Sequence, residues 1–482
     1  MSNFYQLSFF DINKETREFL TDNSSDYFEF FKNFISFTEI IPDSFYNLYY
    51  KTMGRDRSYS LESMFMFFIY KNLRSISKDS SLLDILKDSP DLRLSLGFTS
   101  IPDPSQVSRF KVNFLDQVHL TFDNLVSLVN GELSIILPDL SDILIADTTG
   151  FEGYVTENNP KYFETLLHQA KAYKISGKTS ENFDPVKFAQ SKMSKKANSN
   201  NDFTLSYLNG HFGYYQKAMI ITNGIGVLQD IQFPDKIQEF CDNKMPAEVK
   251  DEYDSKTLIP SLELFFSKHP YKHFSYFLAD SGFDGYDNYK YITKKGMTPI
   301  IPLNKRSGLA KANCFRYSKN NINNDFYFNS KGFLICRKTN LPMKPLGPIN
   351  SKNRADRFSW GCPLIKTSIV KGKCFYKIDC ANPCSNAIYG RKVNIAIDEE
   401  YRFNTSLPRN TKKWQNLYKI RTVCERTIGQ IKDYLNINSS HIRNTTSIKS
   451  TILLAGVSQL IGVLIMVRSG HIDHLRAFKT AA

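Results

Sequence analysis

Two short apolar segments constrain the fold most strongly, because each of them ends in an aspartate. Residues 143–146 are followed by Asp147, and residues 274–279 are followed by Asp280. A short continuous apolar run is typical of a strand that is buried on both faces of a sheet. Carboxylates at the ends of neighbouring strands repel one another unless a cation lies between them. The sequence therefore predicts a mixed α/β domain with two acids at strand ends.

Further strand and helix patterns surround these two segments. Residues 215–222 and 226–233, separated by Asn223-Gly224, predict a β-hairpin in the same sheet. Apolar periodicity predicts a helix before the second acidic strand, a strand after it, and two helices that close the chain. These four elements are expected over residues 259–268, 297–303, 411–437 and 446–467.

The first 130 residues predict helices, because apolar side chains recur at spacings of three and four. Asp103, Pro104 and Gln106 form the pattern of a capped helix start, and one long helix is expected to follow, to about Val129. Paired helices that carry basic residues often bind DNA, but a plain helical bundle produces the same pattern. Both interpretations stay open at this point.

The pattern changes divide the chain into four parts. Residues 1–130 are expected to form a helical N-terminal domain, with DNA binding as its candidate role. Residues 131–303 and 404–482 are expected to form the two halves of the mixed α/β domain. Residues 304–403 are polar and punctuated by Gly and Pro, which predicts a β-rich insertion between these halves.

The charge balance favours a polyanionic partner. The chain has 62 Lys and Arg against 48 Asp and Glu, a net charge of +14, which leaves nucleic acid and an anionic membrane as candidates. The longest apolar stretch, 452–467, contains Ser458 and Gln459 and is shorter than the roughly 20 residues that span a bilayer. It predicts a buried helix. The first residues, with Asp11 and Glu15, lack an export signal, so we expect a cytoplasmic protein.

A basic helix near the C-terminus supplies a third acid. Residues 411–432 contain six basic side chains and one acid, Glu425. At about 100° per residue, four side chains of this helix fall within a wedge of about 60°. An adjacent apolar stripe would pack on the sheet. A solvated basic helix, in which Glu425 pairs locally with Arg421, is the alternative. The wedge contains Tyr418, Arg421, Glu425 and Lys432.

The spacing of these four residues resembles a known signature. Two residues separate Tyr418 from Arg421, three separate Arg421 from Glu425, and six separate Glu425 from Lys432. This matches the Tyr-Arg-Glu-Lys signature of bacterial insertion-sequence transposases of the DDE class, which have an RNase H-like catalytic domain. The sequences around the two aspartates resemble the first and second catalytic-acid motifs of that family, and residues 94–110 resemble part of its helical N-terminal domain.

The resemblance implies a catalytic site. Asp147, Asp280 and Glu425 would bind two Mg²⁺ ions, with Mn²⁺ as a substitute. In two-metal chemistry, one ion activates a water or a DNA 3′-hydroxyl and the other stabilises the leaving oxygen. The basic and aromatic residues of the same helix would hold DNA phosphates. These DNA-binding residues are Tyr418, Arg421, Arg426 and Lys432.

The resemblance also implies partners and leaves rival functions. A transposase of this class binds the terminal inverted repeats and the target DNA, works as a homodimer in the synaptic complex, and acts at the bacterial nucleoid without a membrane. The first rival is an RNase H-like nuclease without strand transfer. The second is a transposase-derived DNA-binding protein that has lost catalysis, and the third is a cysteine-rich structural adaptor, which leaves the basic helix unexplained.

The insertion contains two further features. Trp360 is a candidate to stack on a flipped base, as an aromatic does in some relatives, although a core position is the favoured interpretation. Clustered cysteines are compatible with a structural Zn²⁺ held by Cys362, Cys374, Cys380 and Cys384, with buried free thiols as the alternative. The six cysteines of the insertion are Cys314, Cys336, Cys362, Cys374, Cys380 and Cys384.

A lysine-rich stretch follows the first acidic strand. Seven lysines between Lys171 and Lys196 predict a loop that either tracks the DNA backbone or is simply solvated. His211 precedes a strand, and we interpret it as structural because the histidines show no spacing typical of metal ligands.

Overall fold

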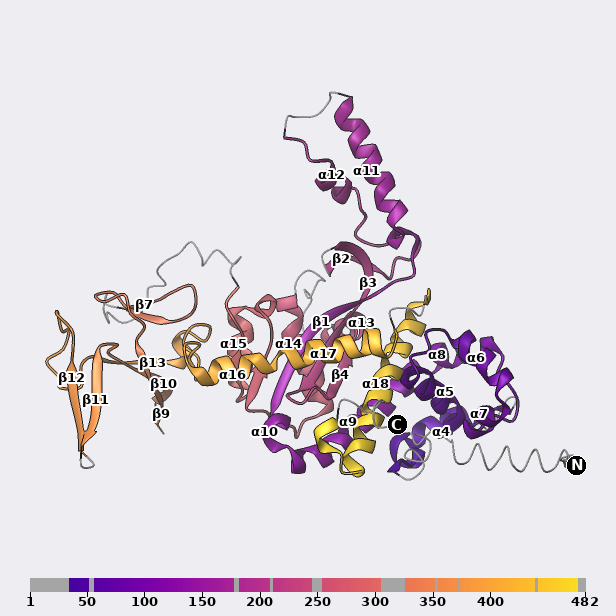
Figure 1. The fold of residues 1–482 in the computed structure, drawn as a ribbon, viewed down its shortest axis with the longest axis horizontal. Coiled ribbons are helices and arrows are strands. Elements are labelled where there is room, and N and C mark those ends of the chain that lie inside the picture. Colours follow the sequence, from indigo (N-terminus) through magenta and orange to yellow (C-terminus); the bar gives the residue numbers. More distant parts are fainter. Residues whose placement is uncertain are drawn as a thin grey trace, which may run out of the picture.

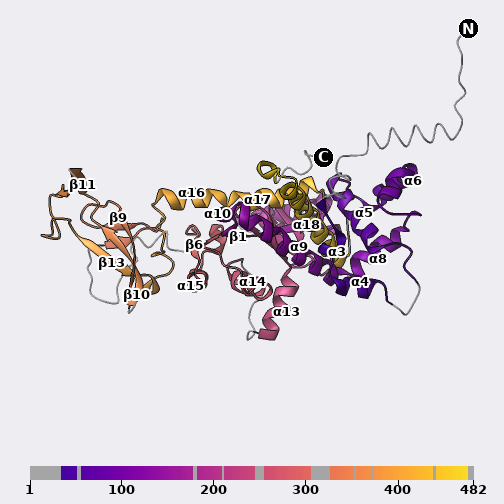
Figure 2. The same ribbon diagram turned by 90° about the horizontal axis from the view of Figure 1, so that it is seen from below.

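The computed structural model describes residues 34–51, 56–176, 182–208, 211–244, 254–304, 326–351, 354–370, 373–437 and 441–475. The described chain is elongated, as Figure 1 shows. The N-terminal helices lie at one end, a mixed sheet lies in the middle, and short strands β7–β13 lie at the other end. Helices α16 and α17 run from the β-rich end to the central sheet, which Figure 2 shows from a second direction.

The central sheet confirms the predicted mixed α/β fold. Strand β1 pairs antiparallel with β3 on one side and parallel with β5 on the other. Strand β6 continues in parallel beyond β5, while β2 and β4 pair antiparallel with β3. An antiparallel part, β1–β4, continued by the parallel strands β5 and β6 is consistent with an RNase H-like sheet. The six strands are β1 Ile143–Glu152, β2 Thr204–Leu208, β3 His211–Asn223, β4 Leu228–Gln232, β5 Tyr276–Leu278 and β6 Thr298–Ile300.

Helices cover both faces of this sheet, so the sheet has one core on each face. Alternate side chains of β1 belong to one core or to the other. Ile143 and Ile145 belong to the larger core, which also includes buried residues of α9, α17 and α18. Leu144 and Ala146 belong to a second core with residues of α14 and α15. Successive strand residues point to opposite faces, so each core takes every second residue. These helices are α9 Leu115–Ile136, α14 Asp254–Lys268, α15 Tyr286–Lys294, α17 Thr422–Gly429 and α18 Thr445–Arg468.

The N-terminal helices share the larger core with the C-terminal helix. Helix α18 packs against α5, α8, α9 and β4, and Asn72 Nδ2 donates to Ser458 Oγ at 2.9 Å inside this core. The two ends of the described chain are therefore joined by buried apolar surface. The other helices of this region are α3 Phe37–Ile40, α4 Asp43–Tyr49, α5 Leu61–Leu73, α6 Asp79–Asp88, α7 Pro90–Ser95, α8 Pro104–Asn113 and α10 Pro138–Ser141.

Helix α18 is long and apolar enough to cross a membrane by its length and composition. The whole of its apolar window, however, is buried inside the chain. Its buried residues include Ser458 and Gln459, the two polar residues of the stretch, and Gln459 Nε2 donates to Gly226 O at 3.1 Å. The predicted buried helix is confirmed.

The helix start at Asp103 is confirmed, but the long helix expected after it is divided. Asp103 and Gln106 form both hydrogen bonds of a capping box. Helix α8 then ends at Asn113, because Phe114 leaves the helical backbone conformation (φ −123°, ψ 24°) before α9 begins. The Phe114 ring lies 5.4 Å from the ring of Phe45. Burial of this ring holds the bend between the two helices.

Strand β1 is longer than expected and does not end at Asp147. Its parallel pairing with β5 stops at Ile145↔Leu278, whereas its antiparallel pairing with β3 continues to Glu152↔Tyr215. The sequence showed the end of the apolar run but not the partner strand that prolongs β1. Asp147 therefore lies within a strand, at the level where the parallel neighbour has already ended.

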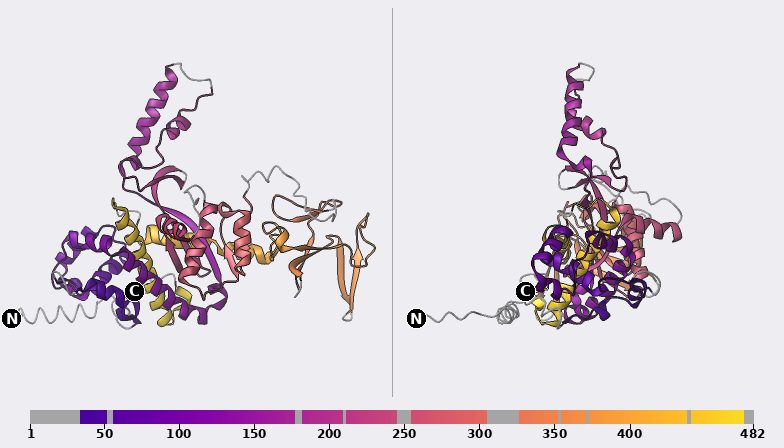
Figure 3. Two further views of the ribbon diagram at one scale, coloured as in Figure 1. Left: turned by 180° about the vertical axis from the view of Figure 1, so that it is seen from behind. Right: turned by 90° about the vertical axis from the view of Figure 1, so that its right-hand side faces the viewer.

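The lysine-rich stretch after β1 forms a helical arm, not a loop. Helices α11 Pro160–Ile175 and α12 Pro185–Ser191 project from the sheet, as Figures 1 and 3 show. The rings of Tyr173 and Phe188 stack at 5.6 Å and hold the two helices together. Lys178 lies outside the described residues. Lysines of the stretch that lie on the two helices are Lys171, Lys174 and Lys187.

Strands β7–β13 form three small sheets within the segment 304–403. Trp360 lies in the core of the three-stranded sheet β13-β10-β9, only 1% exposed, and its ring is 5.1 Å from that of Phe358. The favoured core position is thus observed, and in this conformation Trp360 cannot stack on a base. The strands are β7 Phe326–Phe328, β8 Leu334–Cys336, β9 Lys344–Ser351, β10 Arg354–Gly361, β11 Ile365–Val370, β12 Lys373–Ile378 and β13 Lys392–Ala396.

One aspartate holds the segments that enter and leave this β-rich region. Arg402 Nε donates to Asp284 Oδ1 at 2.7 Å, and its Nη2 also contacts Asp284. The backbone N–H of Asn304 donates to Asp284 Oδ2 at 2.6 Å. Asp284 follows the second acidic strand closely, so this clamp ties the β-rich region to the sheet near Asp280.

Candidate active site

The pleat of the sheet places Asp147 and Asp280 on the same face. Ile145 and Leu278 pair directly and both belong to the core that contains α17. Each aspartate lies two residues beyond its member of this pair, so each points to the same side as that member. Neighbouring strands are about 4.8 Å apart. Two aspartates that are 133 positions apart in the sequence are thus brought side by side.

Helix α17 carries Glu425 to this face. The buried Cys424 Sγ lies 3.9 Å from Ile220 O of β3, and Thr427 Oγ1 donates to Gly226 O at 2.8 Å. These contacts hold the helix on the β3–β4 hairpin, as the apolar stripe predicted. Glu425 lies at the edge of the buried face with 49% of its side chain exposed.

Arg421 bridges two of the three acids. Its Nη2 lies 2.7 Å from Glu425 Oε1, and its Nη1 lies 3.7 Å from Asp147 Oδ2. The expected helix over 411–437 is interrupted at Arg421, between α16 Lys412–Ile420 and α17, and Arg421 N still bonds Tyr418 O at 3.1 Å. The local Arg421–Glu425 pair considered from the sequence therefore exists within the carboxylate cluster.

The pKa of Asp147 reflects its burial and the other acids close to it. Burial raises the pKa of Asp147 to about 7 from its ordinary value of 3.8, and the nearby charges of Asp280 and Glu425 add to the rise. The Arg421 guanidinium acts in the opposite direction but does not cancel the effect. A buried carboxylate with like-charged neighbours is the electrostatic condition that a bound cation relieves.

A turn after β5 orients Asp280. Its Oδ1 accepts a hydrogen bond from Gly282 N at 2.7 Å, which caps the short helix Ser281–Phe283. A Cβ on Gly282 would lie 2.9 Å from Asp280 Oδ1. The absence of a side chain at Gly282 thus allows the close approach between backbone and carboxylate. Capping of this turn and a metal-ligand role are compatible for Asp280, because only its Oδ1 is engaged in the cap.

The proposed DNA-contacting residues spread along β1 and α16–α17. Tyr418 stacks on Trp414 at 5.1 Å and lies under the Arg421 guanidinium. Lys432, in the π-helical turn Gln430–Tyr434, lies 5.5 Å from the Phe151 ring, and burial lowers its pKa. Phe151 is four residues, or about 14 Å of strand, beyond Asp147. Arg426 is exposed beside Glu425.

A cavity of about 640 Å³ continues from the end of β1. The ring of Tyr154 lies 5.0 Å from that of His441, and the Arg443 guanidinium lies 5.3 Å from the Tyr154 ring. No motif in the sequence marked these residues, because the cavity joins the segment after β1 to the segment before α18. His211, interpreted as structural, bonds Tyr215 Oη through its Nε2 at 2.9 Å.

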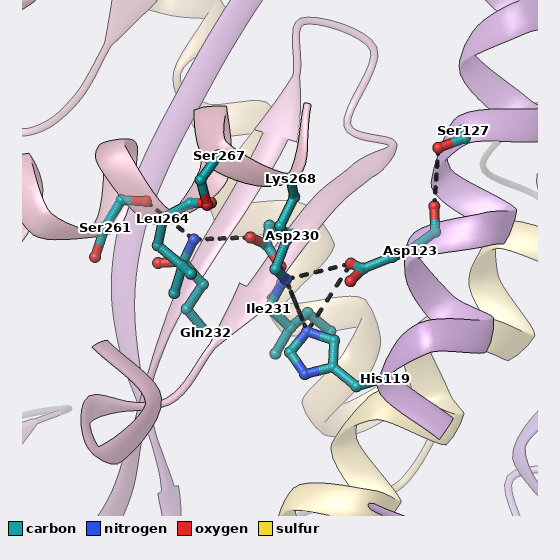
Figure 4. A network of polar contacts seen from close by, with 10 residues as sticks. All are labelled: His119, Asp123, Ser127, Asp230, Ile231, Gln232, Ser261, Leu264, Ser267 and Lys268. Carbon is teal, nitrogen blue, oxygen red and sulfur yellow. Dashed lines mark hydrogen bonds and ion pairs between the residues drawn. The ribbon is translucent and has the colours of Figure 1, made fainter. Parts of the chain in front are cut away.

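A second group of acids lies elsewhere on the sheet and was missed by sequence reasoning. Within the described ranges, one cluster offers three ligand atoms within 4.8 Å of one another: His119, Asp123 and Asp230. Lys268, however, lies among these three side chains, as Figure 4 shows. Its Nζ is 3.0 Å from His119 Nε2, 3.3 Å from Asp123 Oδ1 and 3.1 Å from Asp230 Oδ1. The lysine ammonium occupies the position that a metal ion would take. This cluster is a structural polar network.

The structure separates the four cysteines predicted as zinc ligands. Cys362, Cys380 and Cys384 line one small cavity together with Cys336, whereas Cys374 does not line it and is exposed on β12. Strand β12 carries Cys374 away, since it lies four residues, about 14 Å, before Ile378, which does line the cavity. Cys314 lies outside the described residues.

Family comparisons agree with this fold. A family model described as "Transposase DDE domain" matches residues 245–458, and a second, described as "Transposase domain (DUF772)", matches residues 15–113. The mixed sheet, its flanking helices and the N-terminal helices define an α/β protein consistent with the RNase H-like DDE fold. The chain belongs to the insertion-sequence DDE transposases.

The family assignment carries general properties and leaves the individual residues as predictions. The protein is a DNA transposition enzyme of a family that binds DNA and uses divalent metal ions. Asp280 and Glu425 lie inside the range 245–458, whereas Asp147 lies between the two matched ranges. The Tyr-Arg-Glu-Lys signature stays a prediction. None of the curated proteins compared with the chain matches it.

Proposed function

We propose that this transposase cleaves DNA at the ends of an insertion sequence and joins those ends to target DNA, with Asp147, Asp280 and Glu425 as its catalytic residues. One observation carries the proposal: three distant segments bring three carboxylates together on one face of the sheet. Burial, together with the nearby charges of Asp280 and Glu425, raises the pKa of Asp147. An arrangement that costs stability in this way is typical of a functional site.

The donor set fits divalent magnesium. Three carboxylates offer only oxygen ligands, which suit a hard cation such as Mg²⁺, and Mn²⁺ substitutes at such sites. Asp147, Asp280 and Glu425 would together hold two ions. When bound, the ions supply Lewis-acid activation of the attacking hydroxyl and charge stabilisation of the leaving oxygen.

The basic residues near the three acids would bind DNA. Arg421 pairs with Glu425 and Asp147 in this structure. When these acids hold metal ions, Arg421 would be free to turn toward a DNA phosphate, which its planar fork can bind through two hydrogen bonds. Tyr418 supports the guanidinium, while Lys432 and Arg426 contact phosphates on either side of it.

The rest of the molecule would position DNA around this site. In the proposed division, residues 1–130 bind DNA, residues 131–303 and 404–482 form the catalytic domain, and residues 304–403 form the β-rich insertion. The DNA partners would be the terminal inverted repeats and the target, bound by a homodimer. We place the protein in the bacterial cytoplasm at the nucleoid, without a membrane partner.

Alanine variants of the three acids test the proposal. Asp147→Ala, Asp280→Ala and Glu425→Ala should each reduce Mg²⁺-dependent cleavage of the element's ends by at least about 10³-fold, with DNA binding largely unchanged. Asp84→Ala is the matched control, because Asp84 is an exposed acid that pairs with Lys87 on α6. Cleavage by all three variants at the wild-type rate would contradict the catalytic assignment.

A joining assay separates the proposal from its rivals. Pre-cleaved element ends and a supercoiled target plasmid are supplied together, and joined products are counted. A transposase joins them, whereas an RNase H-like nuclease yields only cuts. A wild-type protein that binds the ends but neither cuts nor joins would be a retired DNA-binding derivative.

A further inference from the structure

We propose that Cys336, Cys362, Cys380 and Cys384 form a structural zinc site that organises the β-rich region. The ligand set differs from the one expected from sequence spacing, because Cys336 replaces Cys374. The inference is independent of the catalytic assignment, since the site lies in the β-rich region and uses none of the three acids.

The size of the cavity selects an ion over an organic ligand. All four cysteines line one cavity of about 10 Å³. This volume holds roughly one water-sized sphere. Four sulfur donors around such a space favour Zn²⁺ in tetrahedral geometry over the hard ions that prefer oxygen.

The four cysteines come from three segments of the chain. Cys336 ends β8, and Cys362 follows β10 directly. Cys380 and Cys384 lie in the segment between β12 and β13, for which the structure shows neither helix nor strand over residues 379–391. Their spacing of three intervening residues is within the range of structural zinc pairs. A shared ion would therefore fix an irregular segment to two strands of different sheets.

The irregular segment already packs closely against one of the cysteines. Gly390 has φ +69°, a conformation that favours glycine. A Cβ at this position would lie 3.1 Å from Cys362 Cβ. The backbone after the Cys380 and Cys384 pair is thus held against Cys362 at the cavity wall.

The cavity also contains positive charge. Lys338 and Arg391 line it with the cysteines, and four thiolates with one Zn²⁺ would carry an excess of two negative charges. The buried Nε of Arg391 has no hydrogen-bond partner in the described structure. Buried donors are almost always paired, and a zinc-bound thiolate would give this N–H an acceptor.

Binding requires an inward movement of the thiols. Zinc–sulfur bonds of about 2.3 Å place the ligand sulfurs about 3.8 Å apart. Among the described residues, only the His119 cluster brings three ligand atoms within 4.8 Å of one another, so the sulfurs surround the cavity at a larger spacing. Rotation of the Cys380 and Cys384 side chains, which are partly exposed, would close the site.

Metal analysis of the full-length chain tests the inference. The protein is purified in a mild reductant without chelator, and zinc is measured by mass spectrometry. We expect about one zinc per chain. Cys336→Ser and Cys384→Ser should each lose more than about half of it, whereas the matched control Cys374→Ser should retain it. Less than half a zinc in the wild type, or equal loss in Cys374→Ser and Cys336→Ser, would overturn the proposal.

A spectroscopic measurement keeps the test decisive if a serine variant fails to fold. Wild-type protein is exchanged with Co²⁺, and its visible spectrum is recorded. Tetrahedral thiolate ligation gives intense d–d bands together with sulfur-to-cobalt charge transfer, and these bands support the proposal. A spectrum of octahedral, oxygen-ligated Co²⁺, or recovery of disulfides among these cysteines from the purified chain, contradicts it.

Discussion

Two groups of acidic side chains lie on the same central sheet and differ in how closely the chain places a cation beside them. In the first group, Asp147 and Asp280 from neighbouring strands meet Glu425 of α17, and the pKa of Asp147 is raised. In the second group, Asp230 of β4 meets Asp123 of α9, and burial together with the charge of Asp230 raises the pKa of Asp123. Burial acts to raise the pKa of Asp230 as well, but Lys268 and His119 together lower it below its ordinary value.

The difference lies in where the balancing cation comes from. Lys268 lies within 3.3 Å of both acids of the second group, so the chain itself places a cation between them. Arg421 pairs closely only with the half-exposed Glu425 and stays 3.7 Å from Asp147. A cluster of acids is therefore a metal-site candidate when the chain leaves its charge unbalanced. Ligand spacing alone selects the other cluster, His119, Asp123 and Asp230.

Removal of Lys268 should cause the largest change in stability. Lys268→Met leaves Asp230 buried without its principal cation, and broken buried ion pairs typically cost about 3 kcal/mol or more. Urea unfolding at pH 7.5 measures the loss. Lys295→Met is the matched control, because Lys295 pairs with Glu263 at 3.5 Å on the surface, and it should cost less than about 1 kcal/mol. Equal losses would contradict the structural role of the Lys268 network.

His269, beside the balanced cluster, should make stability dependent on pH. Burial, together with the charges of Lys272 and Lys268 and against the opposing charge of Asp230, lowers the pKa of His269 from 6.5 to about 4. Below pH 6.5 the His269 imidazole becomes protonated in the unfolded chain but stays neutral in the folded chain. The free energy of unfolding therefore decreases as the pH falls toward 4. His269→Phe should reduce this loss by about 2 kcal/mol. Unchanged pH dependence of unfolding would contradict it.

Asp147 should show the opposite sign. Its folded pKa of about 7 exceeds the ordinary 3.8, so stability declines as the pH rises between these values and stays reduced above pH 7. Without metal, Asp147→Asn should be more stable than wild type at pH 8 by about 1 to 2 kcal/mol. Mg²⁺ should raise the Tm of the wild type but not of the variant. Destabilisation by Asp147→Asn at pH 8 would show that the charge of Asp147 is already balanced in the folded chain. That result would contradict this prediction.

The smallest effect is expected at Lys432. Lys432→Ala should weaken binding of the element's ends by about 1 kcal/mol and reduce the salt slope by about one, because one phosphate contact is lost. Fluorescence anisotropy over a range of salt concentrations measures both quantities. Lys295→Ala, on the opposite face of the sheet, should leave the slope unchanged. Equal slopes for Lys432→Ala and wild type would exclude a phosphate contact.

The sequence was most informative where a feature depends on local pattern. The apolar runs before Asp147 and Asp280 located two strands of the sheet, and the residues around Asp103 located a helix start. The stripe that includes Cys424 and Ile428 indicated which face of the basic helix is buried. Each of these signals lies within about ten residues of chain, where strand and helix periodicity act directly.

Features that depend on distant contacts could not be predicted in the same way. In the sequence, Lys268 and Asp230 are ordinary charged residues. Only the fold, which places α14 beside β4, brings them together. Cys336 lines the cysteine cavity and Cys374 does not, because the pairing and the length of separate strands decide where each cysteine lies. The bend at Phe114 depends on a ring that packs into an aromatic cluster. Sequence spacing contains none of these tertiary contacts.

A comparison of metal binding in two single variants tests the central claim most directly. Mn²⁺ binding is measured by calorimetry for wild type, Asp280→Asn and Asp123→Asn, and each protein is assayed for cleavage of the element's ends. The unbalanced cluster at Asp147, Asp280 and Glu425 predicts that Asp280→Asn loses both Mn²⁺ binding and cleavage, while Asp123→Asn retains both. Loss of Mn²⁺ binding in Asp123→Asn with full binding in Asp280→Asn would contradict the account.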